Sequence, residues 1–146
     1  MNLTRVSYTL DSTLESVNKA EQAASDLGRK VGLSEDEVGG LSMAVREAAV
    51  NAVLHGNRYD ASKRMTLAME ASAELITISV RDEGSGFNAQ SIPDPLAPEN
   101  LLKQSGRGIF LIHTFMDEVH FRDLSPGTEI TMTKHLRKGE NKEDAR

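Results

Sequence analysis

The chain has 146 residues, a length that suits one domain with its own hydrophobic core. Its 38% hydrophobic and 27% charged residues are ordinary for a globular protein, and no apolar run approaches the roughly 20 residues of a membrane span. The absence of cysteine excludes disulfides and thiolate metal sites, and the net charge of −5 argues against direct binding of nucleic acid. Because the N-terminus lacks the apolar core of a secretory signal, we expect a cytoplasmic protein that does not engage a membrane.

The opening stretch predicts a strand followed by a helix. Residues Leu3–Leu10 alternate in the manner of a strand, which we expect at an edge of the sheet. Asp11 or Ser12 can cap the helix that follows, and Glu15 lies where a capping box behind Ser12 needs its carboxylate. This helix should run to about Val31, before a glycine ends it. Its expected inward positions are Leu14, Val17, Ala20, Ala24, Leu27 and Val31.

The stretch from Ser34 to Gly56 predicts one long amphipathic helix, which Ser34 and Glu37 begin with a second capping box. Two glycines inside it, Gly39 and Gly40, each cost about 1 kcal/mol relative to alanine. They indicate either close packing or a helix that starts one turn later. Apolar residues recur at the i, i+3, i+4, i+7 spacing of a buried face, at Val38, Leu41, Val45, Ala48, Ala52 and Val53.

An acid and an amide share one side of this helix. Glu47 and Asn51 are four residues apart, so their side chains project about one turn from each other. Together they could hold a metal–phosphate group and polarise a nucleophile, although the pair taken alone is more simply a solvated helix edge. We interpret His55 as a helix-end histidine near the C-terminal dipole, and Arg46 and Arg58 as surface or interface charges.

The second half of the chain predicts two hairpins separated by a proline-rich loop and a helix. The elements are the strands Met65–Met69 and Leu75–Val80, a short helix at Pro98–Lys103, a helix over Ile109–Phe115, and the strands Glu118–Arg122 and Thr128–Lys134. This order predicts an α+β fold, a two-layer sandwich of a mixed, mostly antiparallel sheet with helices on one face. Residues 1–137 should form the domain and 138–146 a charged tail. The methionines expected to fill the core are Met43, Met65, Met69, Met116 and Met132.

Glycines in the second half lie beside residues that could bind a ligand. Asp82 follows a strand and could accept a hydrogen bond from an exocyclic amine, while Gly84 and Gly86 let a flat ring approach the backbone. Thr128, after Gly127, could offer a hydroxyl to a base or a bound water. Each feature taken alone is equally an ordinary turn or strand start.

A further glycine pair precedes the helix over Ile109–Phe115. The free N–H groups and dipole at the start of that helix would favour phosphate oxygens at Gly106-Arg107-Gly108. Lys103 and Arg107 supply positive charge nearby. A flexible hinge is an equally good interpretation of these glycines on their own.

These stretches occur in one order that resembles the ATPase superfamily of gyrase, the heat-shock chaperone of ninety kilodaltons, histidine kinases and mismatch-repair ATPases, which share the Bergerat ATP-binding fold. The segments VREAAVNAVLHG, VRDEGSG, SGRGIFLIHTFMDEV and GTEITMTKHL are similar to those of small bacterial anti-sigma factors that are also serine kinases. The resemblance runs nearly end to end.

The resemblance implies a role for each matched residue. Asp82 would read the adenine amine, Asn51 would be the protein's Mg²⁺ ligand, and Glu47 would be the general base on the attacking hydroxyl. A lid over Ser91–Ser105 would cover the phosphates. The other nucleotide contacts would be Gly84, Gly86 and Thr128 at the base side, and Lys103, Gly106, Arg107 and Gly108 at the phosphates.

The implied function is an ATP-dependent protein serine kinase, with ATP/ADP and Mg²⁺ as cofactors, that also acts as an anti-sigma factor. It would bind an RNA polymerase sigma factor and phosphorylate an anti-anti-sigma factor on serine, as a homodimer joined through the edge of the opening strand. Two alternatives stay open. One is a nucleotide-dependent switch module that transfers nothing, and the other is a kinase of a stress-signalling scaffold that binds no sigma factor.

Overall fold

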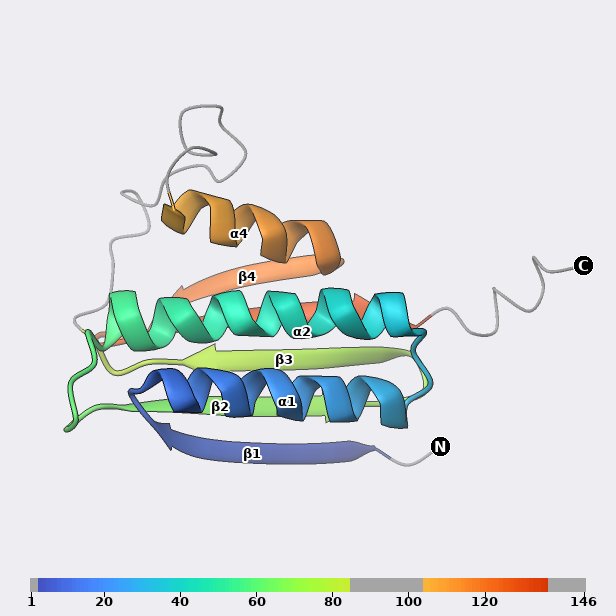
Figure 1. Ribbon diagram of the computed structural model, residues 1–146, viewed down its shortest axis with the longest axis horizontal. Helices are drawn as coiled ribbons and strands as arrows, with labels where there is room; N and C mark the ends of the chain where they lie inside the picture. The colour runs from blue at the N-terminus through green and yellow to red at the C-terminus, as the bar shows by residue number, and fades with distance from the viewer. Residues whose placement is uncertain (1–2, 85–103, 137–146) are drawn as a thin grey trace, which may run out of the picture.

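Within the residues that the computed structural model describes, 3–84 and 104–136, five strands form one sheet and three α-helices lie on one of its faces (Figure 1). The elements are β1 (Thr4–Asp11), α1 (Leu14–Lys30), α2 (Glu35–Val50), the π-helical turn η1 (Asn51–Gly56), β2 (Arg64–Ala71), β3 (Leu75–Arg81), α4 (Gln104–Phe115), β4 (Glu118–Asp123) and β5 (Thr128–His135). The strand order is β1-β2-β3-β5-β4. The predicted two-layer α+β fold is therefore confirmed, and each pair of neighbouring strands is antiparallel.

The opening strand lies at a sheet edge, as predicted. In the described part of the sheet, β1 pairs only with β2, from Thr4 opposite Ala71 to Asp11 opposite Arg64. The ion pair between Asp11 and Arg64 closes one end of this pairing.

Helix α1 begins one residue later than the capping-box prediction. Thr13 is its N-cap and accepts a hydrogen bond from the Ser16 amide, whereas Ser12 is buried and donates its hydroxyl to the Lys63 carbonyl. Glu15 therefore does not complete a capping box with Ser12. Leu14 was expected inward but is 55% exposed. Because helical side chains lean toward the N-terminus, that of the first residue extends past the helix end into solvent.

Helix α2 has the predicted start and the predicted buried face. Ser34 and Glu37 form the capping box, and the six apolar positions expected inward are all buried. The methionine prediction holds for Met65, Met69, Met116 and Met132, which are buried, but is wrong for Met43, which is 43% exposed. Met43 follows the buried Leu41 by two residues, and two residues of α-helix turn the side chain by about 200° to the opposite side.

The long helix expected over 34–56 is two pieces. Helix α2 ends at Val50, and the next six residues wind as the π-helical turn η1, in which the Asn57 amide donates to the Ala52 carbonyl at 2.8 Å. The apolar face continues through this turn, since Ala52 and Val53 are both buried. Isolated π-turns of this kind occur often at functional sites.

Helix α4 begins at Gln104, five residues before the predicted start at Ile109. The Gly106-Arg107-Gly108 motif thus lies inside the first turns of the helix instead of preceding it. A glycine costs a helix only about 1 kcal/mol, which the packing of α4 against α2 can offset. The predicted helix at Pro98–Lys103, Gly86, nearly all of the Ser91–Ser105 lid and the 138–146 tail lie outside the described residues.

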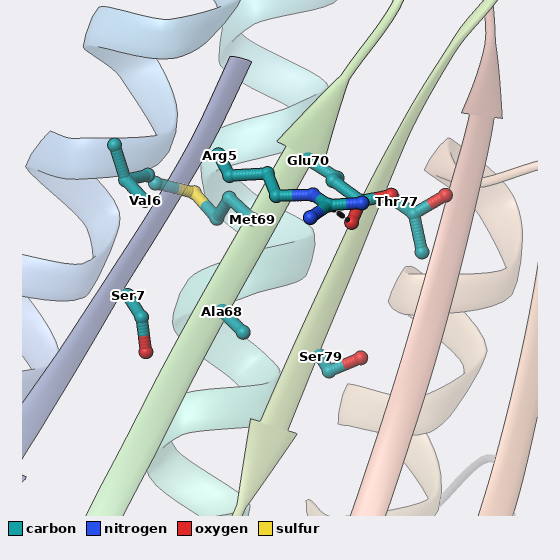
Figure 2. Close-up of a pocket in the computed structure, with 8 residues that line it drawn as sticks. All are labelled: Arg5, Val6, Ser7, Ala68, Met69, Glu70, Thr77 and Ser79. Atoms are coloured by element: carbon teal, nitrogen blue, oxygen red, sulfur yellow. Dashed lines mark ion pairs between the residues drawn. The ribbon is translucent and has the colours of Figure 1, made fainter. Parts of the chain in front are cut away.

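The face of the sheet opposite the helices carries small side chains, several of them polar (Figure 2). Ser7, Ala68 and Ser79 lie side by side across three strands, because the strand register places them opposite one another. The ion pair between Arg5 and Glu70, at 2.8 Å, borders a shallow hollow of about 310 Å³ at this place. In the described part of the chain, no helix is long and apolar enough to span a bilayer.

Candidate functional site

Glu47 and Asn51 lie on the segment where α2 passes into η1. Both side chains are half-buried, and among the described residues neither makes a hydrogen bond or an ion pair. No buried side-chain nitrogen or oxygen in the described part of the chain lacks a hydrogen-bond partner. Against that background, two adjacent half-buried polar groups without internal partners are available to a ligand.

Helix α4 approaches Glu47 through a glycine. A Cβ atom placed on Gly108 would lie 2.6 Å from Glu47 Oε1, closer than such atoms normally approach. Further along the same helix pair, a Cβ on Gly40 would lie 2.7 Å from the Phe115 ring. These two glycines, one on each helix, allow α2 and α4 to pack closely, and they bring the start of α4 to the carboxylate of Glu47.

The first turn of α4 includes Gly106 and Arg107. The first four N–H groups of an α-helix have no carbonyl partner within the helix and carry the positive end of its dipole. Gly106 is the third residue of α4, so its amide belongs to this set, and Arg107 follows it in the same turn. An anion near Glu47 and Asn51 would find these donors beside it.

Asp82 lies at the opposite end of η1, directly after β3. It is only 7% exposed, and its Oδ1 accepts hydrogen bonds from the amides of Gly84 and Thr128, at 3.0 and 3.2 Å. The Asp82 amide in turn donates to the Thr128 carbonyl at 2.9 Å. Burial raises the pKa of Asp82, while the two amide hydrogen bonds and the charge of Lys63 act in the other direction.

Three glycines surround the Asp82 carboxylate and its bend. Gly56, the last residue of η1, faces Oδ2 of Asp82 so closely that a Cβ there would clash with it. Gly84 packs in the same way on the Gly56 carbonyl, and Gly127, at φ +98°, packs on the Asp82 carbonyl. Oδ2 has no hydrogen-bond partner among the described residues, so it can accept one from a ligand.

The segment from Glu47 to Gly56 therefore joins two chemically different ends. One end has Glu47, Asn51 and the start of α4, and the other has Asp82 with Thr128. Comparison with known proteins shows the family to which the chain belongs. The family of histidine kinase-like ATPase domains matches residues 10–134. The serine-protein kinase RsbW of Halalkalibacterium halodurans is 30% identical over 141 residues, which cover 92% of this chain and 85% of that kinase.

This chain belongs to the bacterial anti-sigma factor and serine-protein kinase family of histidine kinase-like ATPases. The anti-sigma F factor of Anoxybacillus flavithermus is similar to it as well, at 32% identity over 108 residues, or 70% of this chain and 73% of that factor. Among solved structures, the RsbU and RsbW domains of a Mycobacterium tuberculosis protein superpose with a TM-score of 0.67 at 18% identity. That match covers 91% of this chain and 32% of the other, and it shows a shared fold.

The fold brings together several of the residues singled out in the sequence. Glu47 meets Gly108, and Asp82 meets Gly84 and Thr128. Gly86 and Lys103 are outside the described residues, so their roles stay predictions. His55 is exposed at the end of η1.

The two arginines set aside as surface charges lie away from these contacts. Arg46 forms an ion pair with Glu21 at 3.0 Å. Arg58 is exposed in the loop after η1, with φ at +52°.

Sequence reasoning missed one buried residue beside the candidate site, Asn57. Its side chain is 1% exposed and makes three hydrogen bonds to segments far apart in the chain. An asparagine after a helix-ending glycine is common in exposed turns, and no local pattern separates the buried case from the exposed one.

Proposed function

We propose that this chain is an ATP-dependent protein serine kinase. One observation carries the proposal: the segment from Glu47 to Gly56 contacts the start of α4 at one end and Asp82 at the other. An adenine nucleotide needs a base-reading group and a phosphate-binding group separated by a ribose. The family membership, which is that of ATPase domains, supports the same ligand.

Asp82 would bind the adenine. Its Oδ2 can accept a hydrogen bond from the exocyclic amine, whereas guanine presents a carbonyl at that position and would be repelled. Glycines at 56, 84 and 127 let the backbone pack closely around the Asp82 bend, which holds this carboxylate in place for the base. Thr128 would contact the base from β5, with Gly84 and the predicted contact Gly86 beside it.

The phosphates would lie at the first turn of α4. Gly106, Arg107 and Gly108 would hold the phosphates, with the free amide of Gly106 donating to a phosphate oxygen and Lys103 as a further predicted cation. Asn51 fits a magnesium ion, because its half-buried amide oxygen is the kind of hard ligand that Mg²⁺ takes alongside phosphates and water. When bound, the ion would neutralise charge on the phosphates.

Glu47 would act as general base. Its carboxylate lies against Gly108, next to the helix start proposed for the phosphates, so it can accept the proton of a serine hydroxyl that attacks the γ-phosphorus. The oxygen–phosphorus bond to the serine forms as the bond to the leaving ADP breaks. Phosphoryl transfer needs mainly positioning and charge neutralisation, which these residues would provide.

The names of the relatives suggest the partners. Because serine-protein kinases and an anti-sigma F factor are both among the relatives, we infer that this chain binds a sigma factor of RNA polymerase. The substrate would then be a serine of an anti-anti-sigma factor. Such partners act in the cytoplasm, where we place this protein too, as a homodimer joined through β1.

The decisive experiment combines calorimetry with phosphate transfer from labelled ATP and Mg²⁺ to the anti-anti-sigma partner. Glu47→Gln should bind ATP as wild type does and transfer phosphate at least about 100-fold more slowly, since general bases contribute roughly that much. Asp82→Asn should lose ATP binding itself. Transfer by Glu47→Gln at the wild-type rate would show that Glu47 is not the base.

A pull-down of wild-type protein from the native cell identifies the partners. Recovery of a sigma factor together with a phosphorylated anti-anti-sigma factor is the expected result. ATP binding without phosphoserine on any recovered protein would instead favour the nucleotide-dependent switch. A phosphorylated scaffold protein without sigma factor would favour the stress-signalling kinase.

A further inference from the structure

Asn57 is a buried asparagine whose side chain joins four separate segments. Its Nδ2 donates to Ser12 Oγ at 2.8 Å and to the Arg64 carbonyl at 3.0 Å, and its Oδ1 accepts from the Glu83 amide at 2.8 Å. With 1% exposure, it has no direct route to a solvent ligand. Any influence on a nucleotide must therefore pass through these neighbours.

The hydrogen bond between Asn57 and the Glu83 amide lies next to Asp82, the residue proposed to bind adenine. Glu83 is the middle residue of the bend Asp82-Glu83-Gly84, and the Gly84 amide donates to Asp82 Oδ1. A second contact holds the same bend, because the Glu83 carboxylate accepts from the Arg64 amide at 2.6 Å. Two links therefore join the bend to the start of β2. The backbone amide of Glu83 is linked to Arg64 through the Asn57 side chain, and the Glu83 carboxylate binds the Arg64 amide directly.

Asn57 also holds the chain on the other side of Asp82, the residue proposed to bind adenine. It follows Gly56, whose Cα faces Oδ2 of Asp82, and its own amide closes the π-turn on Ala52. One residue therefore holds both the glycine on one side of the Asp82 carboxylate and the bend that carries that carboxylate. Loss of Asn57 Oδ1 would leave the Glu83 amide without its partner and let the bend move relative to Gly56.

From this geometry we infer that Asn57 is a positioning residue for base recognition, which sets the preference for adenine by fixing the Asp82 bend against Gly56. The inference rests on the proposed function, since it assumes that Asp82 reads the base. Asn57 takes no part in phosphate transfer, so its effect belongs to nucleotide binding and not to turnover of bound ATP.

Ser12 offers a matched control. Its hydroxyl is buried, accepts from Asn57 Nδ2 and donates to the Lys63 carbonyl, so Ser12→Ala removes two hydrogen bonds of the same network. It leaves the bond between Asn57 and Glu83 in place. A purely structural role for the network predicts that Ser12→Ala and Asn57→Ala behave alike.

The test measures dissociation constants of ATP and GTP by calorimetry on the full chain, with thermal unfolding in parallel. In Asn57→Ala we expect the preference for ATP to fall roughly tenfold, the cost typical of one lost buried hydrogen bond, with kcat at saturating ATP within about twofold of wild type. Ser12→Ala should lower the melting temperature comparably and keep the wild-type preference.

If Asn57→Ala does not fold, Asn57→Ser replaces it in the test. The serine hydroxyl is too short to reach the Glu83 amide, and the smaller side chain leaves room for water. An unchanged preference in Asn57→Ala or Asn57→Ser would overturn the inference, and so would an equal loss in Ser12→Ala. Asp82→Asn separates the two proposals: if it still prefers ATP, the proposed base reader itself is wrong.

Discussion

The carboxylate of Asp82 is buried, and burial disfavours its charged form. Its pKa is raised above the ordinary 3.8 by desolvation, and only partly restored by the Gly84 and Thr128 amides and by Lys63. Above the raised pKa the folded state contains a buried charge that the unfolded state exposes to water. The charge therefore lowers stability at neutral pH, and this cost disappears as the pH falls through the raised pKa toward 3.8.

A stability measurement checks this sign. At neutral pH, Asp82→Asn should melt above wild type, because it removes a buried charge and keeps an oxygen for the two amides. The difference should shrink on acidification, when the wild-type carboxyl takes up its proton. Circular dichroism melts across this pH range measure it. A variant less stable than wild type at neutral pH would mean that the hydrogen bonds of the charged form outweigh desolvation.

Single residues could be predicted from the sequence where their chemistry is local. Asp82 and Gly84 are two residues apart, and Glu47 and Asn51 four, so a short window contains each pair. Asn57 could not be found this way, because its partners Ser12 and Glu83 are 45 and 26 residues away. Only the fold brings them to it.

At the scale of elements, helix α2 contains adjacent glycines with opposite surroundings. A Cβ on Gly39 would meet no atom within 4 Å, whereas one on Gly40 would lie 2.7 Å from the Phe115 ring. The sequence predicted close packing as one possible reason for this pair. The structure assigns that reason to Gly40 alone.

Two alanine substitutions test this difference. Gly39→Ala should stabilise the chain by about 0.5–1 kcal/mol through helix propensity. Gly40→Ala should destabilise it by about 1–3 kcal/mol, because α4 must move to accept the methyl group. Urea unfolding of the two variants gives both values, and each serves as the other's control. A change of the same sign in both would contradict the packing described for Gly40.

Periodicity predicted the buried face of α2 but not where the helix changes its winding. Ala52 and Val53 continue the apolar face through η1, so the hydrophobic pattern gives no sign of the π-turn. The start of α4 was missed for a different reason. Gly106-Arg107-Gly108 has the composition of a turn, and its helical winding depends on packing against α2, which lies far away in the sequence.

At the scale of the molecule, the two hairpins and the helical layer could be predicted, but the strand order could not. Strand β5 lies between β3 and β4, so the last hairpin joins the sheet by its second strand. Nothing in either strand's alternation decides which one pairs with β3. The order leaves β1 at one edge of the described sheet and β4 at the other.

The proposed dimer uses the β1 edge, and a charge placed there should break it. Tyr8 is 41% exposed on β1, and Tyr8→Lys should convert the dimer to a monomer in analytical ultracentrifugation, because charges on edge strands oppose strand pairing. His120→Lys on β4 places the same charge on the opposite edge and should leave the dimer intact. Dissociation by His120→Lys alone would move the interface to β4.

The π-turn has a consequence for how this segment must be wound. A π-turn holds one residue more than an α-helical turn, and each residue of an α-helix turns the chain by about 100°, so rewinding all six residues Asn51–Gly56 as α-helix would change the direction in which the chain leaves α2 by roughly that angle. Gly56 would no longer face Asp82, although no residue of the candidate site need be altered. The winding from Asn51 to Gly56 is thus as much a requirement of this site as the identity of any side chain within it.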